Sequence, residues 1–225
     1  MSWLEKYYET VIESGYYRLL LEGFGNTLLI TIGALIIGVI IGTIIAVTKY
    51  FCEDVPVLKP LYWLCDLYTT VIRGIPVVVL LLITFLIIFA SSDNGVVVAI
   101  ISFGINSGAY MAELIRGGIQ SVDAGQMEAG RSLGLSKLQA MTKIVFPQAI
   151  RYILPSIGNE MIALLKETSV AGYVAVRDLT KAGDQIRNNT YDAVNPLLTV
   201  ALTYLVLVVL MTAVLSKVEK RLAKK

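Results

Sequence analysis

The chain has 225 residues, of which 56% are hydrophobic and only 16% are charged, and its formal net charge is +2. About a quarter of the residues in a typical soluble domain are charged, so this composition, with a mean hydropathy of +0.72, excludes an ordinary soluble protein. Histidine is absent and there are two cysteines, Cys52 and Cys65, which excludes histidine-based acid–base catalysis and disfavours a zinc site.

The N-terminal segment, residues 1–22, mixes acidic, basic and aromatic side chains. It lacks the basic-then-apolar pattern of a cleavable signal. Aromatic rings favour the headgroup zone of a bilayer, and this segment carries Trp3, Tyr7, Tyr8, Tyr16 and Tyr17. We therefore predict an interfacial segment over residues 1–22, with a poorly ordered tail as the alternative.

Long runs without charge indicate membrane spans. A bilayer core about 30 Å thick needs roughly 20 helical residues, and only helices or closed barrels satisfy the backbone in lipid. A further apolar stretch is interrupted by Glu160, Lys166 and Glu167. The sequence predicts an all-α polytopic membrane protein with one permease domain over residues 23–217 and a basic tail over 218–225. Its five expected spans lie near residues 24–48, 62–90, 95–117, 150–176 and 193–216.

The distribution of Lys and Arg predicts the orientation, because cytoplasmic loops carry an excess of positive charge. The C-terminal tail and the loop after the third span are both basic, whereas the N-terminal segment is acidic. We therefore expect the N-terminus outside and the C-terminus in the cytoplasm. The segment 177–195 works against this, because it would be external yet contains Arg177, Lys181 and Arg187.

The loop over residues 123–147 carries its own helix signals. Asp123 with Gln126 has the spacing of a capping box, which predicts a helix over 124–133 that ends at Gly134. Ser136 with Gln139 repeats the spacing and starts a second helix, which Pro147 is expected to bend or end. Periodicity alone also fits a generic amphipathic linker and identifies no partner.

The same loop resembles the EAA loop of ABC importer permeases. Glu128, Ala129 and Gly130 are followed at the family's spacing by Gly134 and by residues 144–147. Gly130 stands where the family has a third Ala, and Phe146 stands where it has Leu. Segments 73–76, 106–113, 116–121, 147–149, 154–155, 159–160 and 165–169 extend the resemblance to polar amino acid permeases over residues 26–215.

This resemblance implies a permease subunit of the cell membrane that forms a dimeric pore with an identical or similar chain. Two cytoplasmic ATPase subunits would bind ATP and Mg²⁺, and an external binding protein would deliver the amino acid. The chain itself has no GxxxxGK[ST] phosphate loop, and no catalytic, metal or nucleic-acid site is expected. The residues expected to couple to the ATPase are Asp123, Gln126, Glu128, Ala129, Gly130 and Gly134.

A substrate path is expected where polar residues lie at membrane depth, since such residues usually face a bundle interior. The candidates are Asn106, Ser107, Tyr110, Asn159 and Glu160. Glu160 suits the ammonium of an amino acid, and Asn106 or a broken-helix N-terminus suits its carboxylate. Hydrogen bonds between helices, or an ion pair of Glu160 with a basic residue, are the alternatives.

Other residues have structural interpretations. Gly33, Gly38 and Gly42 predict close helix packing, and Glu113 with Arg116 predicts an ion pair at the base of the loop. Arg73 and Pro76 are expected to shape a kink.

Two other classes of function remain open from the residues alone. One is an ion-coupled secondary transporter, for which Glu160 is the best carboxylate, and the other is a non-transporting membrane scaffold. A membrane enzyme is disfavoured, since no nucleophile–base or metal constellation exists.

Overall fold

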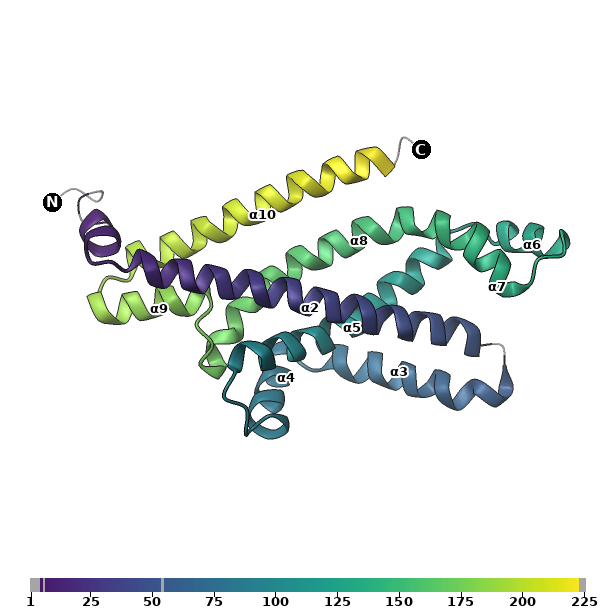
Figure 1. The fold of residues 1–225 in the computed structure, drawn as a ribbon, viewed down its shortest axis with the longest axis horizontal. Coiled ribbons are helices and arrows are strands. Elements are labelled where there is room, and N and C mark those ends of the chain that lie inside the picture. The colour runs from purple at the N-terminus through teal and green to yellow at the C-terminus, as the bar shows by residue number, and fades with distance from the viewer. Residues whose placement is uncertain (1–4, 6, 54, 223–225) are drawn as a thin grey trace. The chain divides into compact units, whose positions relative to one another are not determined.

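The computed structural model describes residue 5 and residues 7–53 and 55–222, and every regular element among them is a helix (Figure 1). Trp3 of the predicted interfacial segment and residues 223–225 of the predicted basic tail lie outside the described residues. The α-helices are α2 (Tyr17–Cys52), α3 (Lys59–Gly74), α4 (Val77–Ile83), α5 (Gly95–Gln120), α6 (Ala124–Ser132), α7 (Lys137–Ala140), α8 (Phe146–Glu167), α9 (Leu179–Thr190) and α10 (Val194–Leu222). The π-helices are η1 (Tyr8–Glu13), η3 (Thr84–Ile88) and η4 (Met141–Val145), and the 3₁₀ helices are η2 (Pro56–Leu58) and η5 (Thr168–Val174).

Three described helices are long and apolar enough to cross a bilayer: α2, α5 and α10. A fourth candidate is the broken pair Pro56–Gly74 and Val77–Ile88. The all-helical membrane class is confirmed, while the number of five spans stays a prediction.

Two of the predicted spans are interrupted. The stretch 62–90 breaks at Ile75 and Pro76, where proline lacks the N–H that would continue the helix and caps α4 in an extended conformation. The stretch 150–176 is α8 up to Glu167 and then the 3₁₀ helix η5.

The N-terminal segment contains two helical pieces. The π-helix η1 ends at Glu13 with Ser14 as its C-cap, and Gly15 adopts a φ of +73°, which suits glycine because it has no Cβ. The chain then enters α2 at Tyr17. Tyr8 and Tyr17 expose 59% and 38% of their surface, as an interfacial role would require.

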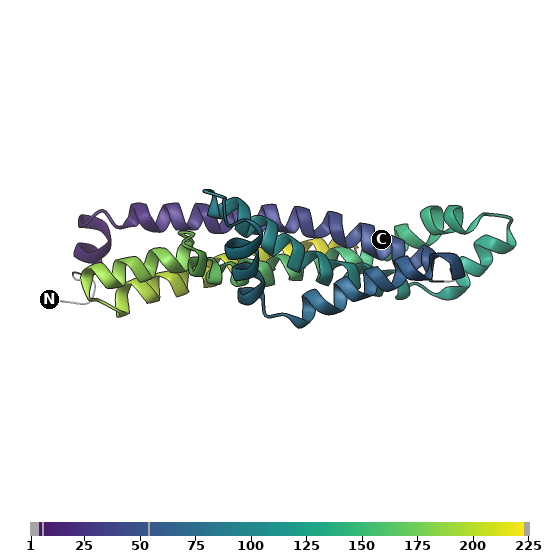
Figure 2. The ribbon, with the colours of Figure 1, turned by 90° about the horizontal axis from the view of Figure 1, so that it is seen from below.

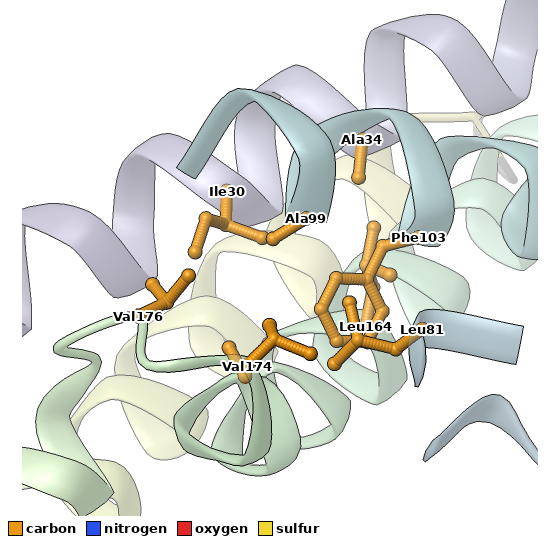
Figure 3. Close-up of a cluster of buried hydrophobic side chains, with 9 residues drawn as sticks. Ile30, Ala34, Leu81, Ala99, Phe103, Leu164, Val174 and Val176 are labelled. Carbon is orange, nitrogen blue, oxygen red and sulfur yellow. The ribbon is translucent and has the colours of Figure 1, made fainter. Parts of the chain in front are cut away.

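The described chain separates into two compact units. The first comprises Met1–Ile36, Ile75–Gly104 and Ile162–Met211. Its core surrounds Phe103 of α5, which is fully buried, and Figure 3 shows Leu81 and Leu164 close to this ring. Ile30 and Ala34 contribute from α2. Helices far apart in sequence thus share one apolar core.

Polar contacts fix the start of α9 against α2 within the first unit. The Leu179 amide donates to Thr27 Oγ1 at 3.0 Å, and Asn26 Nδ2 donates to the Arg177 carbonyl at 2.8 Å. Buried Asp178 caps α9 by accepting from the Thr180 and Lys181 amides. Burial raises the pKa of the Asp178 carboxyl, and these hydrogen bonds act in the opposite direction.

The second unit comprises Ile37–Gly74, Ile105–Met161 and Thr212–Lys225. Here α2 approaches α5 closely at glycine. A Cβ on Gly38 would lie 2.7 Å from Ser107 Oγ, and one on Gly42 would overlap the Met111 side chain. Within the first unit, Gly33 meets Ile100 in the same way. The predicted packing role of these glycines is confirmed.

We expect Gly42→Ala to destabilise the protein by about 1–3 kcal/mol, because the added methyl also lies 2.8 Å from the Ala112 backbone nitrogen and forces the helices apart. Thermal unfolding in detergent measures this effect. The matched control is Gly117→Ala on α5, where an added Cβ meets nothing within 4 Å. Equal melting temperatures for the two variants would contradict this account of the packing.

Candidate functional site

The first helix of the loop over 123–147 begins at Asp123. The Asp123 carboxylate accepts from the Gly125 amide at 2.7 Å, so the predicted N-cap forms. In the predicted capping box, the Gln126 side chain would accept from the backbone amide of Asp123. In the structure it accepts instead from Gln148 Nε2 at 3.2 Å. The start of α6 is thereby tied to the start of α8.

The helix ends at the predicted glycine. Gly134 has a φ of +85°, the left-handed conformation that favours glycine. The Gly134 amide donates to the Arg131 carbonyl, and the Leu135 amide donates to the Gly130 carbonyl at 3.2 Å. Arg131 Nη1 also donates to the Leu135 carbonyl at 2.9 Å. These bonds satisfy the last carbonyls of α6 and hold the turn rigidly.

The second helix starts as predicted, with a complete capping box between Ser136 and Gln139. Its end differs from the prediction. The chain stays helical past Pro147, because α7 continues through the π-helix η4 into α8. Pro147 is the second residue of α8, so it lies in the first turn of that helix and not in its interior. The wider π-helical turn precedes a residue that cannot donate a backbone hydrogen bond.

Figures 1 and 2 show α6 and α7 side by side as a helical hairpin. Gly130 makes this packing close, because a Cβ there would lie 2.8 Å from Ile144 Cδ1 and 3.1 Å from Ala140 Cβ. The departure from the family's alanine therefore has a structural reason. Among the predicted coupling residues, Gly130 is buried; Asp123, Gln126, Glu128, Ala129 and Gly134 are exposed.

A cluster of charged residues in the second unit joins α2, α3 and α5. Lys49 is only 4% exposed, and its ammonium pairs with Asp66 at 2.9 Å and with Glu113 at 3.1 Å. Glu113 also pairs with Arg116 at 2.7 Å, which confirms the predicted ion pair. The Lys49 ammonium lies 5.5 Å from the centre of the Tyr62 ring. Sequence reasoning missed Lys49 and Asp66, since their pairing depends on how two helices pack.

A cavity of about 430 Å³ lies between this cluster and the hairpin. Lys49 and Arg116 line one part of it, and Asp123, Met127 and Glu128 of the α6 region line another. The base of α6 therefore shares a space with the charged cluster.

The structure brings two of the predicted path residues into contact. Ser107 on α5 is fully buried, and its hydroxyl donates to Glu160 Oε1 at 3.1 Å. Glu160 is half-buried on α8. Asn106 is 3% exposed, Tyr110 is half-buried on α5, and Asn159 points to the exposed side of α8.

Tyr110 lies beside Arg73, for which the sequence predicted only a role in shaping a kink. The Arg73 guanidinium carbon lies 5.4 Å from the centre of the Tyr110 ring, within the range of a cation–π contact.

Comparison with known proteins gives a consistent result. A family model described as "Binding-protein-dependent transport system inner membrane component" matches residues 38–224. The chain is 38% identical over 213 residues to the probable glutamine ABC transporter permease protein GlnM of Bacillus subtilis, covering 92% of this chain and 95% of that one. It is 34% identical over 206 residues to the arginine transport system permease protein ArtQ of Bacillus subtilis, covering 90% and 92%.

A solved structure agrees with these sequence relatives. The crystal structure of an amino acid ABC transporter with histidines contains a chain that is 38% identical, with a TM-score of 0.85, covering 93% of this chain and 96% of that one. These matches define a transport protein of the ABC permease class.

The chain belongs to the family of binding-protein-dependent transport system inner membrane components. It is an integral inner-membrane permease subunit, a class without a nucleotide-binding site of its own, and the family predicted from the sequence is confirmed. This membership sets aside the alternatives of an ion-coupled secondary transporter and a non-transporting scaffold.

Lys49→Met should lower the melting temperature, because it leaves the Glu113 carboxylate with one cation and removes the link to α3. Breaking a buried ion pair costs about 3–5 kcal/mol, and we expect less here because Glu113 keeps Arg116 and half of the Asp66 side chain is exposed. The control is Lys143→Met at an exposed position of η4. If both variants unfold at the wild-type temperature in detergent, the cluster does not stabilise the second unit.

Proposed function

We propose that this chain is the permease subunit of an ATP-driven amino acid importer. It forms the translocation pore with a second permease chain, identical or similar. Its full-length relatives support an amino acid as cargo, since they are described as glutamine, arginine and amino acid ABC transporter permeases. ATP and Mg²⁺ bind to the partner ATPase, and an external binding protein delivers the substrate.

The α6 helix is the element that couples transport to the ATPase. The observation that carries this proposal is a polar helix whose partner-facing residues stay exposed while a rigid turn at Gly134 and a buried Gly130 hold its shape. Leu133, next to the turn, is 83% exposed. A rigid, exposed helix end with an apolar residue beside it suits docking into a cleft of another protein.

The orientation follows from this role. Since the ATPase is cytoplasmic, the hairpin and the basic C-terminal residues lie on the cytoplasmic side, and the N-terminus lies outside. The permease domain covers residues 23–217, between an interfacial segment at 1–22 and a tail at 218–225. Five spans follow if α8 crosses the bilayer together with α2, the broken pair, α5 and α10.

The substrate path runs along α5 near Ser107 and Glu160. A carboxylate at membrane depth is costly unless it serves a path or has a partner, and the hydroxyl of Ser107 alone does not neutralise it. The ammonium group of an amino acid supplies the missing positive charge.

Gly134→Asp should uncouple ATP hydrolysis from transport while leaving the protein inserted. A Cβ at Gly134 meets nothing within 4 Å, so the new carboxylate projects toward the partner rather than into its own chain. Uptake and ATP hydrolysis are measured together in proteoliposomes. Gly134→Asn separates charge from backbone strain, since asparagine tolerates the left-handed conformation, and it should keep most of the coupling. Unchanged uptake by Gly134→Asp would sink the docking proposal.

Glu160→Gln should raise the KM for uptake about tenfold, because hydrogen bonds to charged groups contribute about 1.5–3 kcal/mol. Uptake of labelled amino acids by the reconstituted complex gives the KM. Glu219→Gln, at an exposed position of α10, is the control for loss of one carboxylate. A KM and a selectivity equal to those of the wild type would remove Glu160 from the path.

A further inference from the structure

The hairpin of α6 and α7 contacts the C-terminal end of α2 through a cation and an aromatic ring. The Lys137 ammonium of α7 lies 4.9 Å from the centre of the Tyr50 ring. A cation within about 6 Å of a ring centre is attracted to the electron-rich face of the ring, and more strongly where water is excluded. Both side chains are half-buried, so the contact is partly shielded from water.

The partner on α2 belongs to a firmly held part of the second unit. Lys49, the residue before Tyr50, pairs with Asp66 of α3 and with Glu113 of α5. One turn earlier, Ala46 is buried in an apolar cluster with Ile115 of α5 and with Ala149 and Ile153 of α8. The end of α2 is therefore joined to three other helices of this unit.

The partner on the hairpin is held equally well. Lys137 directly follows Ser136, the N-cap of α7, and the complete capping box of Ser136 with Gln139 fixes the start of this helix. The turn at Gly134 and the close packing at Gly130 join α7 to α6. A displacement of α6 therefore carries Lys137 with it.

Elsewhere, the end of α2 and the hairpin are separated by space. The cavity of about 430 Å³ is lined by Ala46 and Tyr50 of α2 and by Met127 and Glu128 of α6. Walls that do not touch transmit no displacement, because dispersion and repulsion act only at contact distance. The contact of Lys137 with Tyr50 bridges the two elements beside this cavity.

We propose that Lys137 and Tyr50 transmit movement of the hairpin to α2, an inference that rests on the proposed function of α6 in coupling. Displacement of α6 by the ATPase then reaches the second unit by two routes. One route is the continuous chain from α7 through η4 into α8. The other is the contact with Tyr50, which moves the end of α2 together with the hairpin. Both residues are positioning residues, since neither touches the transported amino acid in this proposal.

The test measures uptake and ATP hydrolysis together in proteoliposomes that contain the permease–ATPase complex, supplied with its binding protein. The quantity compared is the number of amino acids taken up per ATP hydrolysed. Tyr50→Leu should lower this ratio about threefold to tenfold, the range that corresponds to the strength of a cation–π contact. ATP hydrolysis should continue at the wild-type rate, because the exposed residues of α6 are unchanged.

Further variants assign the effect to this contact. Tyr50→Phe keeps the ring and should keep the wild-type ratio. Lys137→Gln removes the cation and should lower the ratio as much as Tyr50→Leu does. The double variant should be no worse than either single variant, because both substitutions remove the same contact. The matched controls are Tyr152→Leu and Lys217→Gln at exposed positions of α8 and α10, which should keep the wild-type ratio.

A wild-type ratio in both Tyr50→Leu and Lys137→Gln would overturn the proposal. Losses that add in the double variant would also overturn it, and so would a loss in Tyr50→Phe equal to that in Tyr50→Leu. These outcomes leave the proposed function intact as long as the wild-type complex takes up an amino acid. The proposed function itself fails if the wild-type complex with its binding protein takes up none.

Discussion

The close approach of α2 and α5 is the constraint on which the rest of the structure depends. In lipid there is little hydrophobic drive between helices, so association relies on small residues that let backbones come together. Glycines 33, 38 and 42 supply this along α2, and the partners on α5 are Ile100, Ser107 and Met111. Within the apolar 18-residue stretch of each helix, 61% of the residues are buried in α5, 28% in α2 and 6% in α10. These contacts contribute to the deep burial of α5.

Because α5 is held in this way, it can carry a stripe of polar residues. Ser107, Tyr110, Glu113 and Arg116 follow one another at intervals of three, so each lies about one turn beyond the last. Ser107 and Tyr110 lie beside the charges of Glu160 and Arg73, and Glu113 and Arg116 belong to the cluster around Lys49. The proposed substrate contacts and the base of the hairpin are thus parts of one helix.

The sequence predicted best the features that depend on neighbouring residues. The left-handed turn at Gly134, the capping box of Ser136 and the ion pair of Glu113 with Arg116 are set within a few residues, and all three are confirmed. Features that depend on helix pairing were missed, because no spacing rule places Asp66 beside Lys49 or Arg73 beside Tyr110. The start of α6 shows both kinds of feature. The hydrogen bond from the Gly125 amide to Asp123 is local and was predicted, whereas the hydrogen bond from Gln148 of α8 to Gln126 joins two helices and was not.

The two groups of charged residues on the second unit differ in how their charges are matched. Around Lys49 each charge has an opposite partner within hydrogen-bond distance, so the chain itself supplies the counter-charges of the buried ammonium. By contrast, the carboxylate of Glu160 accepts a hydrogen bond from the Ser107 hydroxyl, and the guanidinium of Arg73 lies over the Tyr110 ring. Neither contact supplies an opposite charge. The half-buried Glu160 carboxylate has no basic partner among the described ion pairs, so it is the charge that we assign to the proposed substrate path.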